Sequence, residues 1–523
     1  MGGVFGVCTK HECVMDLFFG TDYHSHLATQ RGGMAVFDGE HFNRVIHNIE
    51  NSPFRAKFEP DISELVGCVG VGCISDSGPQ PIIVHSRIGV FAIATVGRIN
   101  NKAALAERLI SDDNTFFSDL NGGHINDTEL VASIICRRDN IVDGIVYAQS
   151  VIEGSMTMLV CAGDCIYAAR DKLGRTPLSV GRSGEGGESG SGDSGGVGDG
   201  GNYGGGGYDK GGRNRNGGGD DTAGSGGING NGSSDSGFCV SMESFAYLTL
   251  GYKFYYELGP GEVVSITADK VTKLVPPGDA MRICSFLWTY YGFPTSSYEG
   301  VTVEEMRYKC GKSLAVQDKA AGVYTDIYYV AGLPDSGTAY AIGYANESDA
   351  PFARPLIKYT PTWPRSFMPR EQNIREMIAR MKLVPIHSLI KNKKLLFIED
   401  SIVRGTQMRG TTDFVHAYGV KELHVGLACP PILFNCKYLN FSRSTSEDEL
   451  ITRNVIHDLE GADGDKHIAE YADNSTRRYR QMVDTVRKNL NLTSLEYHTL
   501  DGLLDSIGIG KCKLCTYCWN GCE

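Results

Sequence analysis

Short apolar runs separated by turn residues dominate the first 181 or so residues. Runs at 4–7, 33–37, 82–84, 90–94 and 155–160 predict β-strands, and helical spacing of apolar residues predicts helices at about 101–111 and 127–138. Strand-like runs return at 238–242 and 263–266. The pattern predicts an α+β domain with stacked sheets that closes near residue 275.

One segment of this first domain has no such pattern. Residues 183–236 are almost entirely Gly, Ser, Asp and Asn, so they cannot bury enough apolar surface to offset the entropy of ordering them. We therefore predict a disordered insertion. Because strand-like residues flank it, we place it in a hairpin loop, where extra length costs little stability.

The second half alternates helices and strands. Helical periodicity at 303–316 and 338–345 is interleaved with apolar strand-like runs at 327–330, 395–398 and 423–428. This alternation is typical of an α/β domain with a parallel sheet, expected here over residues 276–500. Residues 501–523 form a cysteine-rich C-terminal tail.

Composition narrows the class of partner. A formal net charge of −12 argues against nucleic-acid binding, which needs concentrated Lys and Arg. No run of about 18 apolar residues predicts a membrane span, and no basic-then-apolar start predicts export. We therefore expect a cytoplasmic protein whose 16 cysteines are reduced thiols or metal ligands.

The most informative stretch is 394–406. It predicts a buried strand that ends at Glu399 and Asp400, then a polar loop with Gly405, then a helix. A helix N-terminus offers backbone N–H groups to an anion, and adjacent carboxylates suit sugar hydroxyls or Mg²⁺. The ligand implied is a phosphorylated sugar with a metal, although acid pairs at strand ends equally often have structural roles.

A second strand-to-helix turn, at 334–338, contains Asp335 and Ser336 before a glycine. Such a turn can hold pyrophosphate oxygens and a metal, or it can be an ordinary turn whose serine caps a helix. Since ligands of parallel sheets bind at the carboxyl ends of the strands, we expect both turns to face one pocket.

The string Glu-Asp-Ser-Ile-Val-Arg-Gly-Thr at 399–406 closely resembles the phosphoribosyl-pyrophosphate (PRPP) signature of type I phosphoribosyltransferases, in the form found in glutamine PRPP amidotransferases. The resemblance extends over nearly the whole chain apart from the insertion, through the segments 30–33, 169–178, 242–244 and 257–262. It implies an N-terminal-nucleophile-type glutaminase domain, with stacked sheets between helices, followed by a type I phosphoribosyltransferase domain.

The resemblance also implies site residues and ligands. PRPP would be bound by Asp335, Ser336, Glu399, Asp400, Ser401, Ile402, Val403, Arg404, Gly405 and Thr406. Mg²⁺ would be held by Ser336, Glu399 and Asp400. Lys358 and Arg365 would neutralise the departing pyrophosphate, and purine nucleotides are candidate inhibitors.

The tail carries four cysteines in eleven residues, at 512, 515, 518 and 522, and this spacing suits zinc or an iron–sulfur cluster. The tail cysteines could chelate one Zn²⁺ among themselves. The resemblance is to the branch of the family that carries a [4Fe–4S] cluster, and it implies Cys284, Cys436, Cys515 and Cys518 as ligands. Such a cluster would staple the tail to the transferase domain.

The glutaminase half departs from the family pattern. Gly2 stands where the family has its nucleophilic cysteine, and Cys8 lies in a strand pattern, so we expect a core residue there. The family's His-Asn-Gly-Asn oxyanion stretch corresponds to 95–98, and Ser75 takes the place of the arginine that clamps the glutamine carboxylate. Asp127 remains as a ligand for the glutamine amine. Since the loss of one oxyanion donor costs about 10²–10³ in rate, we predict no glutaminase activity.

Two functions remain open. The first is a pentosyltransferase of the amidophosphoribosyltransferase type, which forms 5-phosphoribosylamine from PRPP and ammonia in purine synthesis, with glutamine a doubtful donor. The second is an inactive paralogue that binds PRPP or nucleotides and regulates an intact amidotransferase. The expected assembly is a homo-oligomer in the first case and a hetero-oligomer in the second. A zinc-stapled scaffold is a third alternative.

Overall fold

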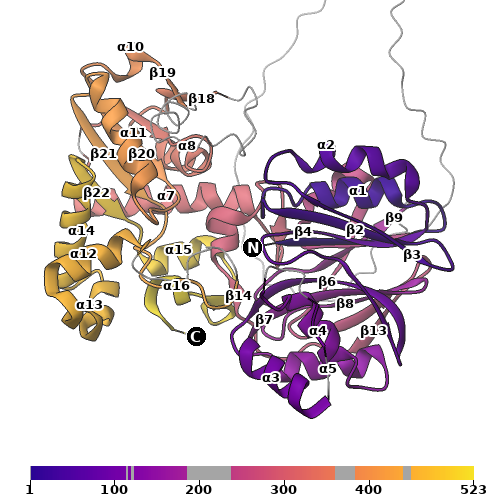
Figure 1. Ribbon diagram of the computed structural model, residues 1–523. Coiled ribbons are helices and arrows are strands. Elements are labelled where there is room, and N and C mark those ends of the chain that lie inside the picture. Colours follow the sequence, from indigo (N-terminus) through magenta and orange to yellow (C-terminus); the bar gives the residue numbers. More distant parts are fainter. Residues whose placement is uncertain are drawn as a thin grey trace, which may run out of the picture.

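The computed structural model describes residues 2–113, 116–118, 123–184, 237–324, 326–359, 383–439 and 449–522. From residue 185 to 236, the predicted insertion lies outside the described residues. Figure 1 shows two halves side by side: a two-sheet half, in indigo and magenta, and a parallel-sheet half, mainly in orange and yellow.

The two-sheet half is a four-layer sandwich of helices, sheet, sheet and helices (Figure 1). In spatial order the first sheet contains β11 (Tyr252–Glu257), β9 (Ser179–Ser183), β10 (Phe238–Ser241), β1 (Gly3–Cys8), β4 (Val69–Ser75), β2 (Arg31–Phe37) and β3 (Phe42–Asn48). The second contains β13 (Val271–Val275), β12 (Val263–Ile266), β8 (Cys165–Ala169), β7 (Gly154–Ala162), β6 (Gly89–Ile99) and β5 (Ile82–Ser86).

Helices cover the outer faces of both sheets (Figure 1). The first sheet carries α1 (Val14–Asp22), α2 (Phe54–Phe58), the short η1 (Glu59–Glu64) and α6 (Phe245–Leu250); the second carries α3 (Lys102–Asp113), α4 (Asp127–Ile135) and α5 (Ile141–Val151). All six residues of β1 are buried, because α1 covers one face and the second sheet covers the other. The predicted stacked-sheet architecture is confirmed.

Cys8 lies inside this sandwich. It is fully buried, and its thiol donates a hydrogen bond to the carbonyl oxygen of Ile266 at 3.2 Å. Burial raises the pKa of Cys8 well above its ordinary value. The prediction that Cys8 is a core residue is confirmed.

The strands on either side of the insertion pair with each other. β9 and β10 are antiparallel neighbours, in a register that runs from Ser179 opposite Ser241 to Arg182 opposite Phe238. The two strands that flank the insertion in sequence are therefore neighbours in the sheet.

The second half contains a four-stranded parallel sheet in the order β17 (Tyr329–Gly332), β20 (Lys394–Glu399), β21 (Glu422–Leu427) and β22 (Ser494–Tyr497). Alternate residues of β20 enter two different cores. Leu396 and Ile398 pack in the core with α7 (Val303–Ala321) and α8 (Thr338–Glu347), and Leu395 and Phe397 in the core with α11 (Thr406–Ala417) and α14 (Arg477–Asn489). The predicted parallel sheet is confirmed.

Shorter elements complete this half. They are β14 (Ile283–Cys284), η2 (Leu287–Tyr291), β15 (Ser297–Tyr298), β16 (Val301–Thr302), β18 (Leu356–Lys358), β19 (Leu383–Pro385), α10 (His387–Ile390), α12 (Ile451–Glu460), η4 (Gly461–His467), α13 (Ile468–Ala472), α15 (Leu500–Ile507), η5 (Lys511–Lys513), β23 (Leu514–Cys515) and α16 (Tyr517–Asn520). β14 pairs in parallel with β23, so the C-terminal tail is tied to the segment that joins the two halves.

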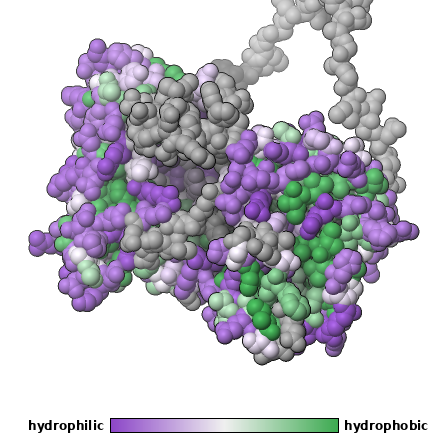
Figure 2. All heavy atoms as spheres, viewed as in Figure 1, coloured by the Kyte–Doolittle hydropathy of each residue, from purple (hydrophilic) through white to green (hydrophobic). Residues whose placement is uncertain are grey.

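The outer surface differs between the halves. On the face in view in Figure 2, apolar residues gather over the two-sheet half, whereas the parallel-sheet half is mostly hydrophilic. Each helix among the described residues is too short or too polar to cross a lipid bilayer.

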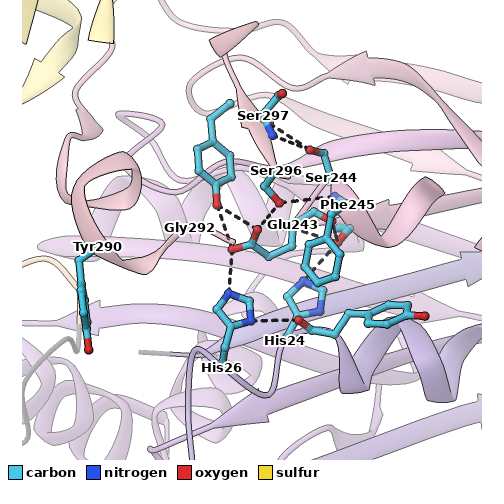
Figure 3. Close-up of polar contacts among 12 residues, drawn as sticks. His24, His26, Glu243, Ser244, Phe245, Tyr290, Gly292, Ser296 and Ser297 are labelled. Atoms are coloured by element: carbon cyan, nitrogen blue, oxygen red, sulfur yellow. Dashed lines mark hydrogen bonds and ion pairs between the residues drawn. The ribbon is translucent and has the colours of Figure 1, made fainter. Parts of the chain in front are cut away.

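The two halves meet at the buried carboxylate of Glu243, which follows β10 (Figure 3). Glu243 is 1% exposed, and it accepts hydrogen bonds from the hydroxyls of Ser296 and Tyr298, the latter at 2.9 and 3.0 Å. His26 Nε2 lies 3.3 Å from the same carboxylate. One buried carboxylate of the two-sheet half thus accepts two hydroxyl donors from the other half and faces a histidine of its own half.

Asp318, on α7, makes stability depend on pH. Its side chain is buried, and Tyr344 Oη donates to its Oδ2 at 3.1 Å. Burial raises the pKa of Asp318 from 3.8 to about 7. Between these two values the folded state holds a proton that the unfolded chain has released, so the stability contributed by this group falls as pH rises through that window.

We therefore expect Asp318→Asn to stabilise the fold at about pH 8 by on the order of 2 kcal/mol, measured as a higher thermal denaturation midpoint, and to do so much less at about pH 4, near the pKa of an unfolded Asp. Asp458→Asn, at an exposed position of α12, is the control. Parallel pH profiles for wild type and Asp318→Asn would contradict this assignment.

Candidate functional site

The acid pair of the PRPP-like signature lies at the carboxyl end of β20. Glu399 is the last residue of the strand and Asp400 follows it; both side chains are buried, at 5% and 4% exposure. The turn between β17 and α8 lies beside them, since Ser336 Oγ donates to Glu399 Oε1 at 2.5 Å. The strand order thus brings the two predicted turns together.

The electrostatics of this pair favour a bound cation. Burial and the neighbouring charge of Asp400 raise the pKa of Glu399 well above its ordinary range. Neither carboxylate forms an ion pair with Lys, Arg or His within the described residues. Buried carboxylates without a cationic partner, beside a serine hydroxyl, fit the oxygen ligands that Mg²⁺ prefers.

The loop after the acid pair leads into α11. Ser401 Oγ donates to Asp400 Oδ2 at 2.6 Å, and Ile402 is buried beneath the loop. Gly405 precedes α11 with a φ of +75°, a conformation that glycine adopts without strain. Arg404 forms an ion pair with Glu449, so its charge is neutralised within the protein.

Lys358, at the end of β18, reaches the same place. Its Nζ lies 2.8 Å from Asp335 Oδ2, with both side chains about half exposed or more. A cation is thus positioned at the turn predicted to hold pyrophosphate. Arg365, predicted to share this role, lies outside the described residues.

A second recess lies in the two-sheet half and gathers the residues that the sequence matched to a glutaminase site. It encloses about 350 Å³, part of it open to solvent, and it is lined by Gly2, Ser75, Asp76, Ser77, Thr95, Val96, Gly97, Asp127 and Met156. No cysteine is among these lining residues. The recess therefore has hydroxyls and carboxylates but no thiol nucleophile.

Backbone packing closes this recess at Gly2. A Cβ atom at position 2 would lie 2.6 Å from the carbonyl oxygen of Ile74, closer than real Cβ atoms approach. Elsewhere in the recess, Asp127 Oδ1 lies 2.5 Å from Lys102 Nζ, and Asp76 Oδ1 accepts the backbone N–H groups of Thr29 and Gln30. Both carboxylates already have partners in the protein.

A third cavity lies where the tail meets both halves. It encloses about 310 Å³, part of it open to solvent, and it is lined by Arg175, Cys284, Phe286, Cys436, Tyr438, Leu439, Cys515, Tyr517, Cys518 and Trp519. All four cysteines that the resemblance implied as cluster ligands are present. Cys512 and Cys522 are exposed and do not line the cavity.

The cavity is held by pairing of β14 with β23, which places Cys284 opposite Cys515. A hydrogen bond from Cys518 lowers the pKa of Cys436 to about 7, whereas burial raises the pKa of Cys284. No three His, Cys, Asp or Glu side chains of the described residues converge closely enough for a single metal ion. Four thiols spaced around a cavity suit a larger inorganic group.

Sequence reasoning did not assign Arg175, Tyr438 and Trp519 to this cavity. Arg175 lies within the segment 169–178 that carried the family resemblance, but its contact with the tail spans 340 positions of sequence. The sequence offered one signal for Arg175: it is a charged residue within a segment that the family resemblance places in the folded domain, where its side chain proves to be buried.

No protein-family model matches this chain. Curated proteins, in contrast, are similar to it over its whole length. The amidophosphoribosyltransferase of Methanocaldococcus jannaschii is 25% identical over 553 residues, which span 100% of this chain and 97% of that protein. Relatives from other organisms carry the same name, including that of Bacillus subtilis, which is 24% identical.

Two solved structures share the fold. Glutamine PRPP amidotransferase from B. subtilis, complexed with ADP and GMP, has a TM-score of 0.75 at 23% identity and covers 100% of this chain and 97% of that one. A structure described as the allosteric regulatory enzyme of purine biosynthesis has a TM-score of 0.76 at 23% identity, covering 100% and 96%. The predicted fold class is confirmed, and this chain is similar over its whole length to curated amidophosphoribosyltransferases.

Proposed function

We propose that this protein transfers the phosphoribosyl group of PRPP to ammonia, giving 5-phosphoribosylamine and pyrophosphate at the entry to purine synthesis. The observation that carries the proposal is the hydrogen bond between Ser336 and Glu399, with Lys358 on the neighbouring Asp335. Two phosphate-type turns and an acid pair thus converge at one edge of the parallel sheet.

The reaction forms one bond and breaks one bond at the anomeric carbon. The lone pair of ammonia forms the new C–N bond, pyrophosphate leaves with the electron pair of the C–O bond, and the new nitrogen loses a proton to water. Negative charge develops on the leaving group, so Lys358 and Arg365 stabilise the transition state there. Glu399 and Asp400 orient the ribose hydroxyls, and residues 401–406 bind the 5′-phosphate.

Mg²⁺ fits this site because Glu399 and Asp400 are buried without a cationic partner among the described residues. Ser336, Glu399 and Asp400 would hold it. When bound, it neutralises charge on the pyrophosphate.

The two-sheet half does not hydrolyse glutamine in this proposal. Its recess has Gly2 and Val96 where the family's chemistry needs a nucleophile and an oxyanion donor, and its packing leaves no room for a Cβ at position 2. Ammonia therefore comes from solution or from a partner glutaminase. We retain the division at about residue 275 between the glutaminase-like and transferase domains, with the tail from 501.

A [4Fe–4S] cluster fits the cysteine cavity. Cys284, Cys436, Cys515 and Cys518 line one cavity, whereas two of the four tail cysteines needed for a tail-only Zn²⁺ site are exposed outside it. The bound cluster would supply a rigid cross-link between the tail and the segment that joins the two halves.

Regulation through a second chain is the alternative function. Leu248 and Phe254, on α6 and β11, are 76% and 62% exposed, and such apolar surface supports assembly with another copy or with an intact amidotransferase. Because the B. subtilis relative was solved with ADP and GMP, purine nucleotides are the inhibitors we would test first.

The central test is pyrophosphate release from PRPP. We expect release to require Mg²⁺ and ammonium and not to occur with glutamine alone. Lys358→Met should lower the rate by about 10²-fold, because one stabilising charge is removed from the leaving group. Lys391→Met, at an exposed position before β20, is the control. Tight PRPP binding without turnover would instead support the regulatory paralogue.

The glutaminase prediction is tested by restoring a thiol. We expect Gly2→Cys to release no more glutamate from glutamine than wild type does, because its Cβ must displace the backbone at Ile74. Gly410→Cys, where a Cβ meets open space on α11, controls for an added cysteine. Glutamate release by wild type at rates above roughly a few per second would overturn the prediction.

The choice between cluster and zinc is tested by pairs of serine variants. We expect anaerobically purified wild type to contain iron and acid-labile sulfide in equal amounts. Cys436→Ser should lose them, whereas Cys512→Ser should keep them, since only Cys436 lines the cavity. The opposite result, with zinc retained in Cys436→Ser and lost in Cys512→Ser, would favour a tail zinc site.

A further inference from the structure

Arg175 is a buried cation in the wall of the cysteine cavity. It is 3% exposed, and its Nη1 donates a hydrogen bond to Cys515 Sγ at 3.2 Å. Its guanidinium carbon lies 3.3 Å from the centre of the Tyr438 ring, so the planar group is held flat against an aromatic face. Both contacts fix the side chain toward the sulfur atoms.

The charge of Arg175 has no carboxylate partner. Within the described residues it forms no ion pair, and its Nε, although buried, has no hydrogen-bond partner. An arginine stays protonated in proteins, and a buried charge is strongly unfavourable unless an opposite charge faces it. Neutral thiols do not supply that charge, whereas metal-bound thiolates do.

Arg170, in the same segment, is a buried arginine whose positive charge is balanced by a carboxylate. It is fully buried, its Nη1 lies 2.8 Å from Glu299 Oε1, and its other nitrogens donate to the carbonyl oxygens of Gly174 and Thr176. Arg175, five residues later, faces the cysteine cavity where Arg170 faces a carboxylate. A negative charge that balances Arg175 would therefore lie in this cavity.

Arg175 also joins the two halves at this cavity. Its carbonyl oxygen accepts the backbone N–H of Cys284 at 3.1 Å, while its side chain contacts Cys515. One residue of the glutaminase-like half thus touches two cysteines that come from opposite ends of the transferase half.

We propose that Arg175 is a positioning residue for the cluster, holding Cys515 in place and balancing the negative charge of an iron–sulfur group with four thiolate ligands. This inference rests on the proposed cluster. Hydrogen bonds to ligand sulfurs and nearby positive charge raise a cluster's reduction potential and help to retain it. The glutaminase-like half thereby completes the cofactor site of the other half.

The test compares Arg175→Met and Arg175→Lys with wild type, all as full chains purified without oxygen. We expect Arg175→Met to lose iron and sulfide to a chelator about tenfold faster or more, and to have a lower midpoint potential. Arg175→Lys keeps the charge but not the planar stacking, so its potential should lie between the two. If Arg175→Met folds poorly, the loss rate and midpoint potential of Arg175→Lys still show whether the geometry of the arginine matters.

Arg282→Met is the matched control, because Arg282 contacts the same tail through the backbone carbonyl of Cys512, outside the cavity. It should behave as wild type. A wild-type potential and loss rate in both Arg175 variants would overturn this inference and leave the cluster standing. Wild type without iron and sulfide would overturn the cluster and this inference together.

Discussion

A charged side chain that is taken out of water needs hydrogen bonds or an opposite charge, and this protein buries such groups along the line where its two halves meet. Glu243 is surrounded by hydroxyl donors from the transferase half (Figure 3). Arg170 meets Glu299 across the same boundary. Separating the halves would remove these partners from both buried charges, so this boundary helps to fix how the halves pack.

The same constraint also applies at the two proposed ligand sites. Glu399 and Asp400 are buried acids without a cation, and Arg175 is a buried cation without an acid, within the described residues. A divalent metal with a phosphorylated sugar would balance the two acids. A thiolate-bound cluster would balance the arginine. Unbalanced buried charge therefore indicates ligands as clearly as the motifs do.

Local patterns predicted the parts of this fold that depend on neighbours in sequence. The apolar run before Glu399 gave a buried strand because both faces of β20 are covered, and strand order then brought the turn at Ser336 beside it. Helix α7 is longer than its apolar spacing predicted. It continues through Gln317 and Ala321 until Gly322 adopts a left-handed conformation, a stop that the glycine itself signalled.

Contacts between distant parts of the chain could not be predicted in this way. The approach of Arg175 to Cys515 and the closure of Gly2 against Ile74 depend on how completed elements pack. The four cysteines that the family resemblance implied as cluster ligands line one cavity, but the resemblance carried no information on the arginine that faces them. Sequence patterns that predict single helices and strands do not predict which side chains meet where the two halves pack together.

Contacts of this kind also tie the two-sheet half to the cysteine cavity. Arg98, the last residue of the stretch 95–98, donates to the carbonyl oxygen of Cys436 at 2.9 Å, and Asn100 donates to that of Lys437 at 2.9 Å. The end of β6 thus holds the loop that carries a cavity cysteine. Substitutions that destabilise this half would therefore loosen the cysteine cavity, which places a structural requirement on the fold of the two-sheet half.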